Sequence, residues 1–311
     1  MSESGRDALH VVFSMDCLPA GEVGEVRGPA NWQDAARSPV AFAETLAALG
    51  LGATVFIAPE ALGRMAGAVQ KLQDAGCELG ILCHPQLAGQ QACLGSYSYD
   101  RQMQIVRASL DAWSQAMGRL PQAFRPGFFS ANDYTFHVLC MLGLRQGSCS
   151  LPGRIDNEQC SMWFGSYPFP HHTDPLDRSA KGSMEFFEVP VTSDFAAASF
   201  NSQDTFTPPC LRIEEPQVHE YARDLIERQL AGMDDEGLST KTVHLVTSNL
   251  VGWGGADDPH IDRLRNLCSM LGELADRRGL DLQWTSLAEL HELADREYPQ
   301  LMDEDLADGL S

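Results

Sequence analysis

Three polar residues stand at the ends of short apolar runs of the sequence. Asp16 follows the run HVVFSM, His84 follows ELGILC, and Arg125 stands just before Pro126-Gly127. Brought together, a carboxylate, an imidazole and a guanidinium could form an acid/base centre or part of a metal site. Each also has an ordinary interpretation, because Asp often forms turns after strands, and lone His and Arg residues often make structural hydrogen bonds or surface ion pairs.

The elements that would position these residues alternate along the chain. Alternating strands and helices predict a parallel sheet, open or closed into a barrel. Polar residues that follow such strands gather on one face, where ligands bind, and Ser248-Asn249 after the run TVHLVT join the same set. The sequence predicts strands at 10–15, 53–57, 78–83, 185–191, 242–247 and 280–284, and helices at 39–49 with Ser38 as N-cap, 60–75, 100–117, 132–142, 218–230 and 259–274.

Two long segments, 151–184 and 195–215, do not fit this alternation. The first is rich in Pro, Gly and aromatic residues and the second is similar, which predicts lids or binding loops. We predict one barrel domain over residues 1–296 and an acidic, disordered tail at 297–311.

The composition indicates which classes of partner and which cellular compartment to expect. The 311 residues include 43 Asp and Glu against 22 Lys and Arg, giving a net charge of −21. That field repels nucleic acids and anionic membranes, so we expect a small-molecule or carbohydrate substrate. No apolar stretch is long enough to cross a bilayer, and the first residues lack the pattern of a secretory signal. The nine cysteines are odd in number and form no CxxC pair, which predicts free thiols in a reducing cytoplasm.

The ordered pieces of the sequence resemble the polysaccharide deacetylases, the NodB-homology proteins of carbohydrate esterase family 4. The resemblance spans roughly residues 8–293 and rests on order and spacing more than on any single piece. The matching segments are SMDCLP at 14–19, ATVFIAPEAL at 53–62, GCELGILCHPQ at 76–86, FRPGFFSANDYTFHVLCMLGLRQGS at 124–148, EVPVT at 188–192 and HLVTSN at 244–249. The resemblance implies an α/β fold, a distorted parallel (β/α) barrel with fewer than eight strands.

The resemblance also implies an activity, the hydrolysis of an N-acetyl group on an amino sugar or a related amide. In that family one Asp and two His hold a divalent metal, usually zinc, and a second Asp held by an Arg is the general base. The family pattern T-F-D-D-G-P puts Asp16 at the base position and Cys17 at the metal Asp, whereas a slip of one residue makes Asp16 the ligand. His84-Pro85 fits the second His of the variant ELG-x-H-x-H-P, and Arg125 fits the Arg that holds the base.

The match to the family pattern is incomplete at the metal ligands and at the proton donor. The family's two His positions fall on Leu82 and Gln86, with His84 between them, and its late acidic His falls on Ser248. A usual zinc centre has three protein ligands and an open fourth position. Asp16 or Cys17 and His84 would supply two. A third would come from a loop, and His171, His172 and His260 are the candidates.

Three hypotheses follow. The first is an active amidase or deacetylase in which Asp16 is the base, Arg125 orients it and His84 binds metal or acts as acid; a metal-free version acting on a ureide or amide is included. Its predicted substrate site comprises Trp163, Tyr167, His171, His172, Ser248 and Trp253, the aromatic rings stacking on the substrate.

The second hypothesis is a non-catalytic binding or regulatory protein with the same barrel. The third is an unrelated α/β barrel, disfavoured because no Gly-rich phosphate loop or clear carboxylate pair is present.

Overall fold

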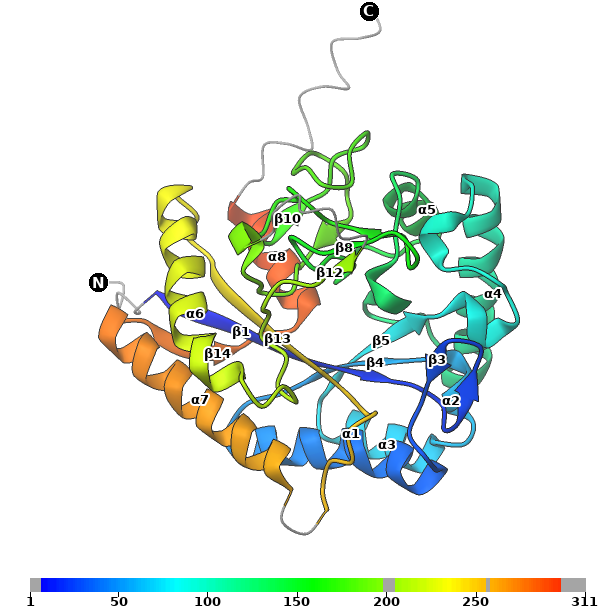
Figure 1. Ribbon diagram of the computed structural model, residues 1–311, viewed down its shortest axis with the longest axis horizontal. Helices are drawn as coiled ribbons and strands as arrows, with labels where there is room; N and C mark the ends of the chain where they lie inside the picture. Colours follow the sequence, from blue (N-terminus) through cyan, green and yellow to red (C-terminus); the bar gives the residue numbers. More distant parts are fainter. Residues whose placement is uncertain (1–6, 198–204, 256–257, 298–311) are drawn as a thin grey trace, which may run out of the picture.

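A curled, mostly parallel sheet forms the centre of the computed structural model, which describes residues 7–197, 205–255 and 258–297 (Figure 1). The strand order is β10-β11-β7-β6-β5-β4-β1-β13, with β14 paired to β1 off this path, and within this sheet only the β10–β11 pairing is antiparallel. The strands of this sheet are β1 (Ala8–Cys17), β4 (Thr54–Ile57), β5 (Glu78–Cys83), β6 (Phe124–Pro126), β7 (Gln146–Gly147), β10 (His171–His172), β11 (Phe187–Glu188), β13 (Lys241–Ser248) and β14 (Asp281–Trp284).

Helices cover the outside of this sheet and one of its ends. The helices are α1 (Trp32–Ala47), α2 (Pro59–Leu62), α3 (Ala66–Asp74), α4 (Tyr99–Met117), α5 (Thr135–Met141), α6 (Val218–Asp235), α7 (Pro259–Arg278) and α8 (Leu287–Glu297), with 3₁₀ turns at Pro85–Ala88, Leu94–Ser96, Gly127–Phe129 and Phe195–Ala197. Two small sheets lie in the connections: β2 (Glu22–Val23) with β3 (Val26–Arg27), and β8 (Ile155–Asp156) with β9 (Ser161–Met162) and β12 (Thr205–Phe206). Over the described ranges, no helix is long and apolar enough to span a membrane.

The gap between the edge strands is bridged by an irregular segment. Thr192 donates its backbone N–H to the carbonyl of His244, and its Oγ1 accepts the His244 N–H at 3.0 Å. On the other side Val191 donates its N–H to the carbonyl of Ser150. The segment after β11 therefore joins β13 to the extension of β7, and the sheet closes into a distorted barrel, which confirms the predicted fold.

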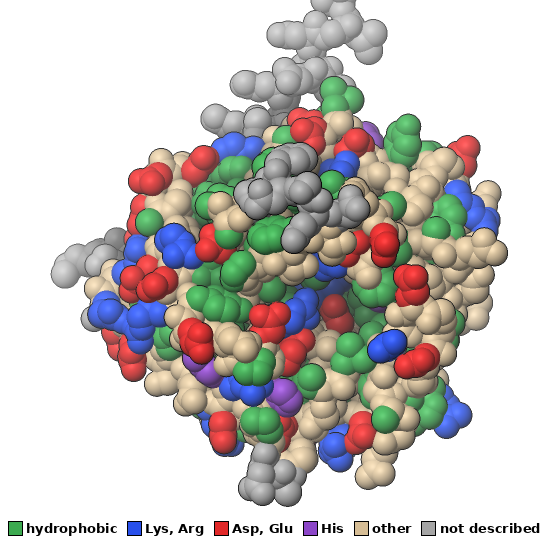
Figure 2. All heavy atoms as spheres, viewed as in Figure 1, with side chains coloured by type: hydrophobic (Ala, Val, Ile, Leu, Met, Phe, Trp, Pro, Cys, Tyr) green, Lys and Arg blue, Asp and Glu red, His purple; other side chains and the backbone are tan. Residues whose placement is uncertain are grey.

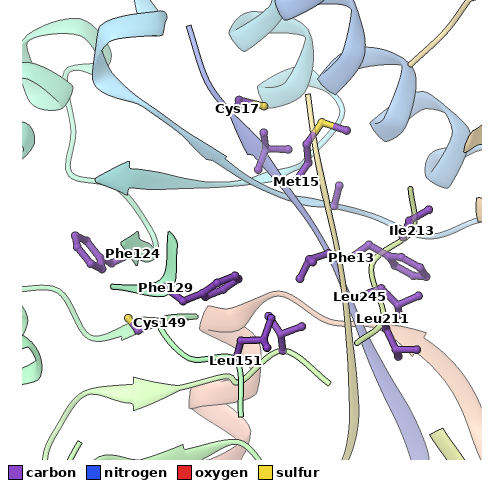
Figure 3. Packing of buried hydrophobic residues seen from close by; sticks show 14 of the residues in the cluster. Phe13, Met15, Cys17, Phe124, Phe129, Cys149, Leu151, Leu211, Ile213 and Leu245 are labelled. Carbon is purple, nitrogen blue, oxygen red and sulfur yellow. The ribbon is translucent and has the colours of Figure 1, made fainter. Parts of the chain in front are cut away.

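Side chains along β1 alternate between two environments. Phe13, Met15 and Cys17 belong to the large cluster that packs under the outer helices (Figure 3), whereas Val12 belongs to a separate cluster with Phe56 of β4. This period of two places Ser14 and Asp16 on the face opposite Cys17. Asp16 is thereby directed to the polar interior.

The first helix begins earlier than Ser38, so the predicted N-cap is wrong. The helix starts at Trp32, capped by the side chain of Asn31, which accepts the Asp34 N–H at 2.9 Å. Pro39 lies inside the helix and cannot donate to the carbonyl of Ala35. The Asn249 side chain donates to that carbonyl at 3.5 Å, so a residue after β13 supplies the hydrogen bond that Pro39 cannot make.

Other element bounds also differ from the sequence prediction. The helix expected at 60–75 is split into α2 and α3, and the strand expected at 185–191 is paired as a strand over only two residues, β11. Of the predicted tail at 297–311, residues 298–311 lie outside the described residues.

Candidate active site

An ion pair spans the interior of the barrel near the carboxyl end of β1. Arg125 Nη1 lies 2.8 Å from Asp16 Oδ1, and the arginine side chain is 1% exposed while the aspartate is 25% exposed. The two residues come from β6 and β1, which are separated in the sheet by β5 and β4. The pair therefore meets across the curled sheet, as predicted for polar residues near strand ends.

Hydrogen bonds fix the Arg125 guanidinium on its other sides. Nη2 donates to Ser14 Oγ at 3.0 Å and to Ser148 Oγ at 2.9 Å, and Nε donates to the Ser148 carbonyl at 3.2 Å. The guanidinium also lies over the Phe56 ring at 4.2 Å. Because its donors are held on several sides, Arg125 presents Nη1 to Asp16 in a fixed direction.

His244 completes the network beneath Arg125. Its Nδ1 faces the Val189 carbonyl at 3.2 Å and therefore carries the proton, leaving Nε2 to accept from Ser14 at 2.8 Å. Burial and the Arg125 charge lower the pKa of His244 to about 3. The imidazole is thus neutral at physiological pH and adds no second charge next to the guanidinium.

His84 lies at the end of β5, packed against the turn that follows Arg125. A Cβ placed on Gly127 would lie 2.1 Å from His84 Nδ1, so only glycine fits there. The ring meets Phe128 edge-on at 4.7 Å. Burial lowers the pKa of His84 to about 4, with the Asp16 charge and the Gln86 side chain acting in the opposite direction. Asp16 and Arg125 are therefore in direct contact, and His84 lies close enough for the Asp16 charge to act on its pKa.

The turn beside His84 is strained. Phe128 and Phe129 both have positive φ, 59° and 55°, although neither is glycine. Such conformations cost on the order of 1–3 kcal/mol each and persist only where surrounding contacts impose them. The Trp163 indole N–H donates to the Phe129 carbonyl at 2.7 Å and holds the turn.

Further charges lie near Asp16. Burial alone would lower the pKa of Arg212, but Glu214, Cys210 and, with a smaller effect, Asp16 outweigh burial and raise it. Arg212 Nη1 contacts Glu214 Oε1 at 3.1 Å, and both side chains are partly exposed. Figure 2 shows the molecule hollowed near the centre of the view, where acidic and basic side chains lie close together.

The two tryptophans predicted as aromatic platforms are not available for stacking. Trp163 and Trp253 are both 0% exposed, so neither ring offers a face to a substrate, and we withdraw that part of the predicted substrate site. Trp253 packs instead against Phe42, 5.1 Å between ring centroids. Tyr167 is partly exposed, with Lys181 Nζ 4.7 Å from its ring centroid.

The other predicted substrate residues are dispersed. Ser248 is paired in register with Asp16 and stays a candidate at this site. His171 is buried, with Nδ1 2.7 Å from the Phe169 carbonyl, and burial lowers its pKa to about 4. His172 belongs to a separate group with His291 on α8.

The residues around Asp16 do not fit the predicted three-ligand metal centre. In the part of the chain that the structure describes, only one group of three His, Cys, Asp or Glu residues has ligand atoms within 4.8 Å of one another, and it contains neither Asp16 nor His84. The three histidines proposed as a third ligand therefore do not complete the site. The Asp16 carboxylate is instead paired with Arg125.

Cys17 is also wrong as a metal ligand at this site. Its side chain lies in the hydrophobic cluster on the other face of β1 (Figure 3). Burial raises the pKa of the thiol well above its ordinary value, with smaller contributions from Asp16 and Cys77. A protonated thiol facing the core cannot supply the thiolate that metals require.

Sequence reasoning missed several supporting residues. Ser14 and His244 occupy inward positions of two neighbouring strands, and the period of two along each run was a signal for them. Glu188 accepts the backbone N–H groups of Cys149 and Ser150 and the Ser150 hydroxyl at 2.7 Å. Burial raises the pKa of Glu188 to about 7 despite these donors. No spacing in the sequence indicated that carboxylate.

Comparison with known proteins finds similar solved structures at low sequence identity. No family model and no curated protein matches the chain. The solved structures that share its fold include the following three. A protein of Mycobacterium smegmatis described as a polysaccharide deacetylase is 14% identical, with a TM-score of 0.56, 96% of this chain and 93% of that chain being covered. Puue allantoinase is 11% identical, with a TM-score of 0.57 and coverages of 95% and 93%.

A protein of Pseudomonas aeruginosa PAO1, also described as a polysaccharide deacetylase, is 12% identical, with a TM-score of 0.57 and coverages of 94% and 93%. At these identities the likeness shows the fold, and it confirms the resemblance to the deacetylase barrel that the sequence indicated.

Proposed function

We propose that this chain hydrolyses a non-peptide carbon–nitrogen bond, as in N-deacetylation of an amino sugar or a related small amide or ureide. The proposal rests on one observation, the Asp16–Arg125 ion pair at the carboxyl end of β1 with His84 beside it. The fold that the chain shares with two proteins described as polysaccharide deacetylases and with an allantoinase supports this reaction class.

Asp16 is the proposed base. Its Oδ1 is paired with Arg125, which leaves Oδ2 to accept a proton from water as the water oxygen adds to the substrate carbonyl carbon. The tetrahedral intermediate then breaks its C–N bond, and the proton that Asp16 took passes to the leaving nitrogen. Asp16 has to carry that proton in both directions, because Ser248 stands at the position of the late acidic His and is a poor acid at neutral pH.

His84 is the proposed polarising group. With a pKa of about 4, its imidazolium form is rare at pH 7, which argues against the charged acid that the sequence suggested. A neutral imidazole N–H can still donate a hydrogen bond to a carbonyl oxygen as negative charge develops there. The donor set around Asp16 does not fit a metal, so no step here passes through one.

The second candidate function is a non-catalytic binding or regulatory protein. The same observation that removes the metal centre favours it: over the described residues, Asp16 and His84 lack a third ligand at metal-binding spacing. We retain it as the alternative outcome of the experiment below. All nine cysteines are unpaired, which supports a proposed cytoplasmic location in either case.

The deciding experiment measures acetate or ammonia release from a panel of N-acetyl amino sugars, small amides and ureides. We expect the full chain to turn over at least one of them and Asp16→Asn to lose that activity. The exposed Asp111→Asn on α4 is the matched control and keeps it. If the wild-type chain has no activity on the whole panel, the binding-protein alternative holds. If Asp16→Asn matches an active wild type, Asp16 is not the base.

A further inference from the structure

We propose that His172, His291 and Asp295 form a divalent metal site at the end of the sheet opposite Asp16. The ligand atoms of the three residues all lie within 4.8 Å of one another. Nε2 of His172 is 3.3 Å from Asp295 Oδ1, and Nε2 of His291 is 3.6 Å from the same oxygen. The site joins β10 at the edge of the sheet to α8, the last described helix.

The position of the site follows from Gln146, which opens β7 and contacts His291. Ser148, two residues further along the same chain direction, contacts Arg125. Glu78, which opens β5, accepts the N–H groups of the first turn of α8. The cluster and α8 therefore lie at the amino ends of the parallel strands, whereas Asp16 lies near a carboxyl end.

The tautomers of both imidazoles are fixed by their other ring nitrogens. His172 Nδ1 lies 2.9 Å from the Met184 carbonyl, which can only accept, so Nδ1 carries the proton. His291 Nδ1 lies 3.2 Å from Gln146 Oε1. The Gln146 amide nitrogen donates to the Gln122 carbonyl, which fixes its oxygen toward His291. In the neutral state both Nε2 atoms therefore direct lone pairs toward Asp295, the arrangement that metal-binding histidines use.

The atoms that face one another lack a proton donor between them. His291 Nε2 is buried, in a side chain that is 5% exposed, and has no hydrogen-bond partner. Two imidazole lone pairs and a carboxylate oxygen repel one another, and a cation between them removes that repulsion.

The spacing suits a tetrahedral cation. Ligand bonds of about 2.0–2.1 Å separate neighbouring ligand atoms by roughly 3.3–3.4 Å in a tetrahedral centre. The two Nε2–Oδ1 distances, 3.3 and 3.6 Å, lie close to that value. Two imidazoles and one carboxylate favour Zn²⁺, Co²⁺ or Ni²⁺ over the harder Mg²⁺ and Ca²⁺.

The surroundings hold the ligands and leave one side open. Phe187 stacks on His291, 5.1 Å between centroids with an interplanar angle of 2°, and meets His172 edge-on at 5.3 Å. Asp295 is 42% exposed, which gives room for a water as fourth ligand. Arg145 is the one cation paired with Asp295 in the described residues; it approaches Oδ2, at 3.8 Å, and leaves Oδ1 to the imidazoles.

The experiment is a calorimetric titration of the chelator-dialysed full chain with Zn²⁺. We expect one ion per chain, a loss of at least about 100-fold in affinity for His172→Ala and for Asp295→Asn, and a loss of about 10–100-fold for Gln146→Leu, which frees the His291 tautomer. The control is His84→Ala, which leaves Zn²⁺ affinity unchanged. Circular dichroism verifies that each variant is folded. Asp295→Asn is the variant expected to disturb folding least, because Asp295 is exposed.

Three outcomes would overturn the proposal. The wild-type chain could bind no stoichiometric Zn²⁺, or folded Asp295→Asn and His172→Ala could bind it as tightly as the wild type. Loss of binding in His84→Ala would place the ion at the other end of the barrel. The first two outcomes leave the proposed hydrolysis untouched, because the titration is scored without substrate. The third would also contradict a metal-free mechanism at Asp16 and His84.

Discussion

The two ends of the barrel hold the same kinds of side chain in opposite arrangements. At the carboxyl end, the Asp16 carboxylate is 2.8 Å from a guanidinium that is 1% exposed, and the nearby His84 imidazole has an unpartnered Nδ1. At the amino end, the Asp295 carboxylate faces two imidazoles, and the guanidinium of Arg145 is 3.8 Å away and 55% exposed.

In the two proposals, the partner of the carboxylate decides the chemistry. A buried guanidinium with its own hydrogen bonds neutralises Asp16 and directs it, which suits a base and disfavours a metal ligand. An exposed, distant guanidinium leaves Asp295 available to a cation. Residue types alone would have predicted a metal at either end.

The largest expected effect is a loss of activity on substitution at the carboxyl end of the barrel. Asp16→Asn removes the base, so kcat/KM for the substrate found in the release assay should fall by about 10²–10⁴-fold. Asp295→Asn is the matched change at the other end and should leave kcat/KM within about twofold. Equal losses in both variants would contradict the division of roles between the two ends.

The next effect concerns stability. Arg125→Met leaves the Asp16 carboxylate without its counter-ion and removes donors from Ser14 and Ser148, so the free energy of unfolding should fall by about 3–5 kcal/mol. Arg145→Met, at an exposed pair, should change it by less than about 0.5 kcal/mol. Urea denaturation measures both. A small loss in Arg125→Met would mean that the network contributes little.

The third effect is a pH dependence at the carboxyl end. The pKa of Glu188 is raised from 4.5 to about 7 in the folded chain, so the native state holds a proton that the unfolded state releases. Its contribution is therefore fully present below pH 4.5 and is lost as the pH rises through 7.

Between these limits the wild-type unfolding free energy should fall by roughly 3 kcal/mol relative to Glu188→Gln, whose amide does not titrate. Denaturation curves at several pH values measure this difference, and the exposed Glu185→Gln should follow the wild type. Parallel pH profiles for wild type and Glu188→Gln would show that burial does not perturb this carboxyl.

The smallest expected effect is a change in Zn²⁺ affinity at the amino end of the barrel. Arg145→Met removes the positive charge near Asp295, so Zn²⁺ affinity should rise by about two- to fivefold at low salt. The same titration as above measures it. A weaker affinity in this variant would show that Arg145 orients Asp295 for the cation rather than competing with it.

The parts of the fold and of the candidate site that leave a local signal could be predicted from the sequence. The runs that end at Asp16, His84 and Arg125 identified strand ends, and parallel strand ends meet in space. The first helix was misplaced because nothing local indicates that Asn249 donates to the Ala35 carbonyl that Pro39 leaves without a donor, a contact across 214 positions of the chain.

The rest depended on contacts that no pattern encodes. Trp163 has the residue type of a stacking platform, but burial made it a donor to Phe129. His172 and Asp295 lie 123 positions apart and meet because α8 packs under the sheet edge. Long-range packing of this kind leaves no period or motif in a single sequence.

The central claim is that hydrolysis and metal binding occupy opposite ends of the barrel. Its most direct test measures kcat/KM and bound metal on one preparation of the full chain, before and after chelator dialysis. The account predicts that the metal leaves with kcat/KM unchanged within about twofold. A loss of activity that follows the metal and returns with added Zn²⁺ would contradict it.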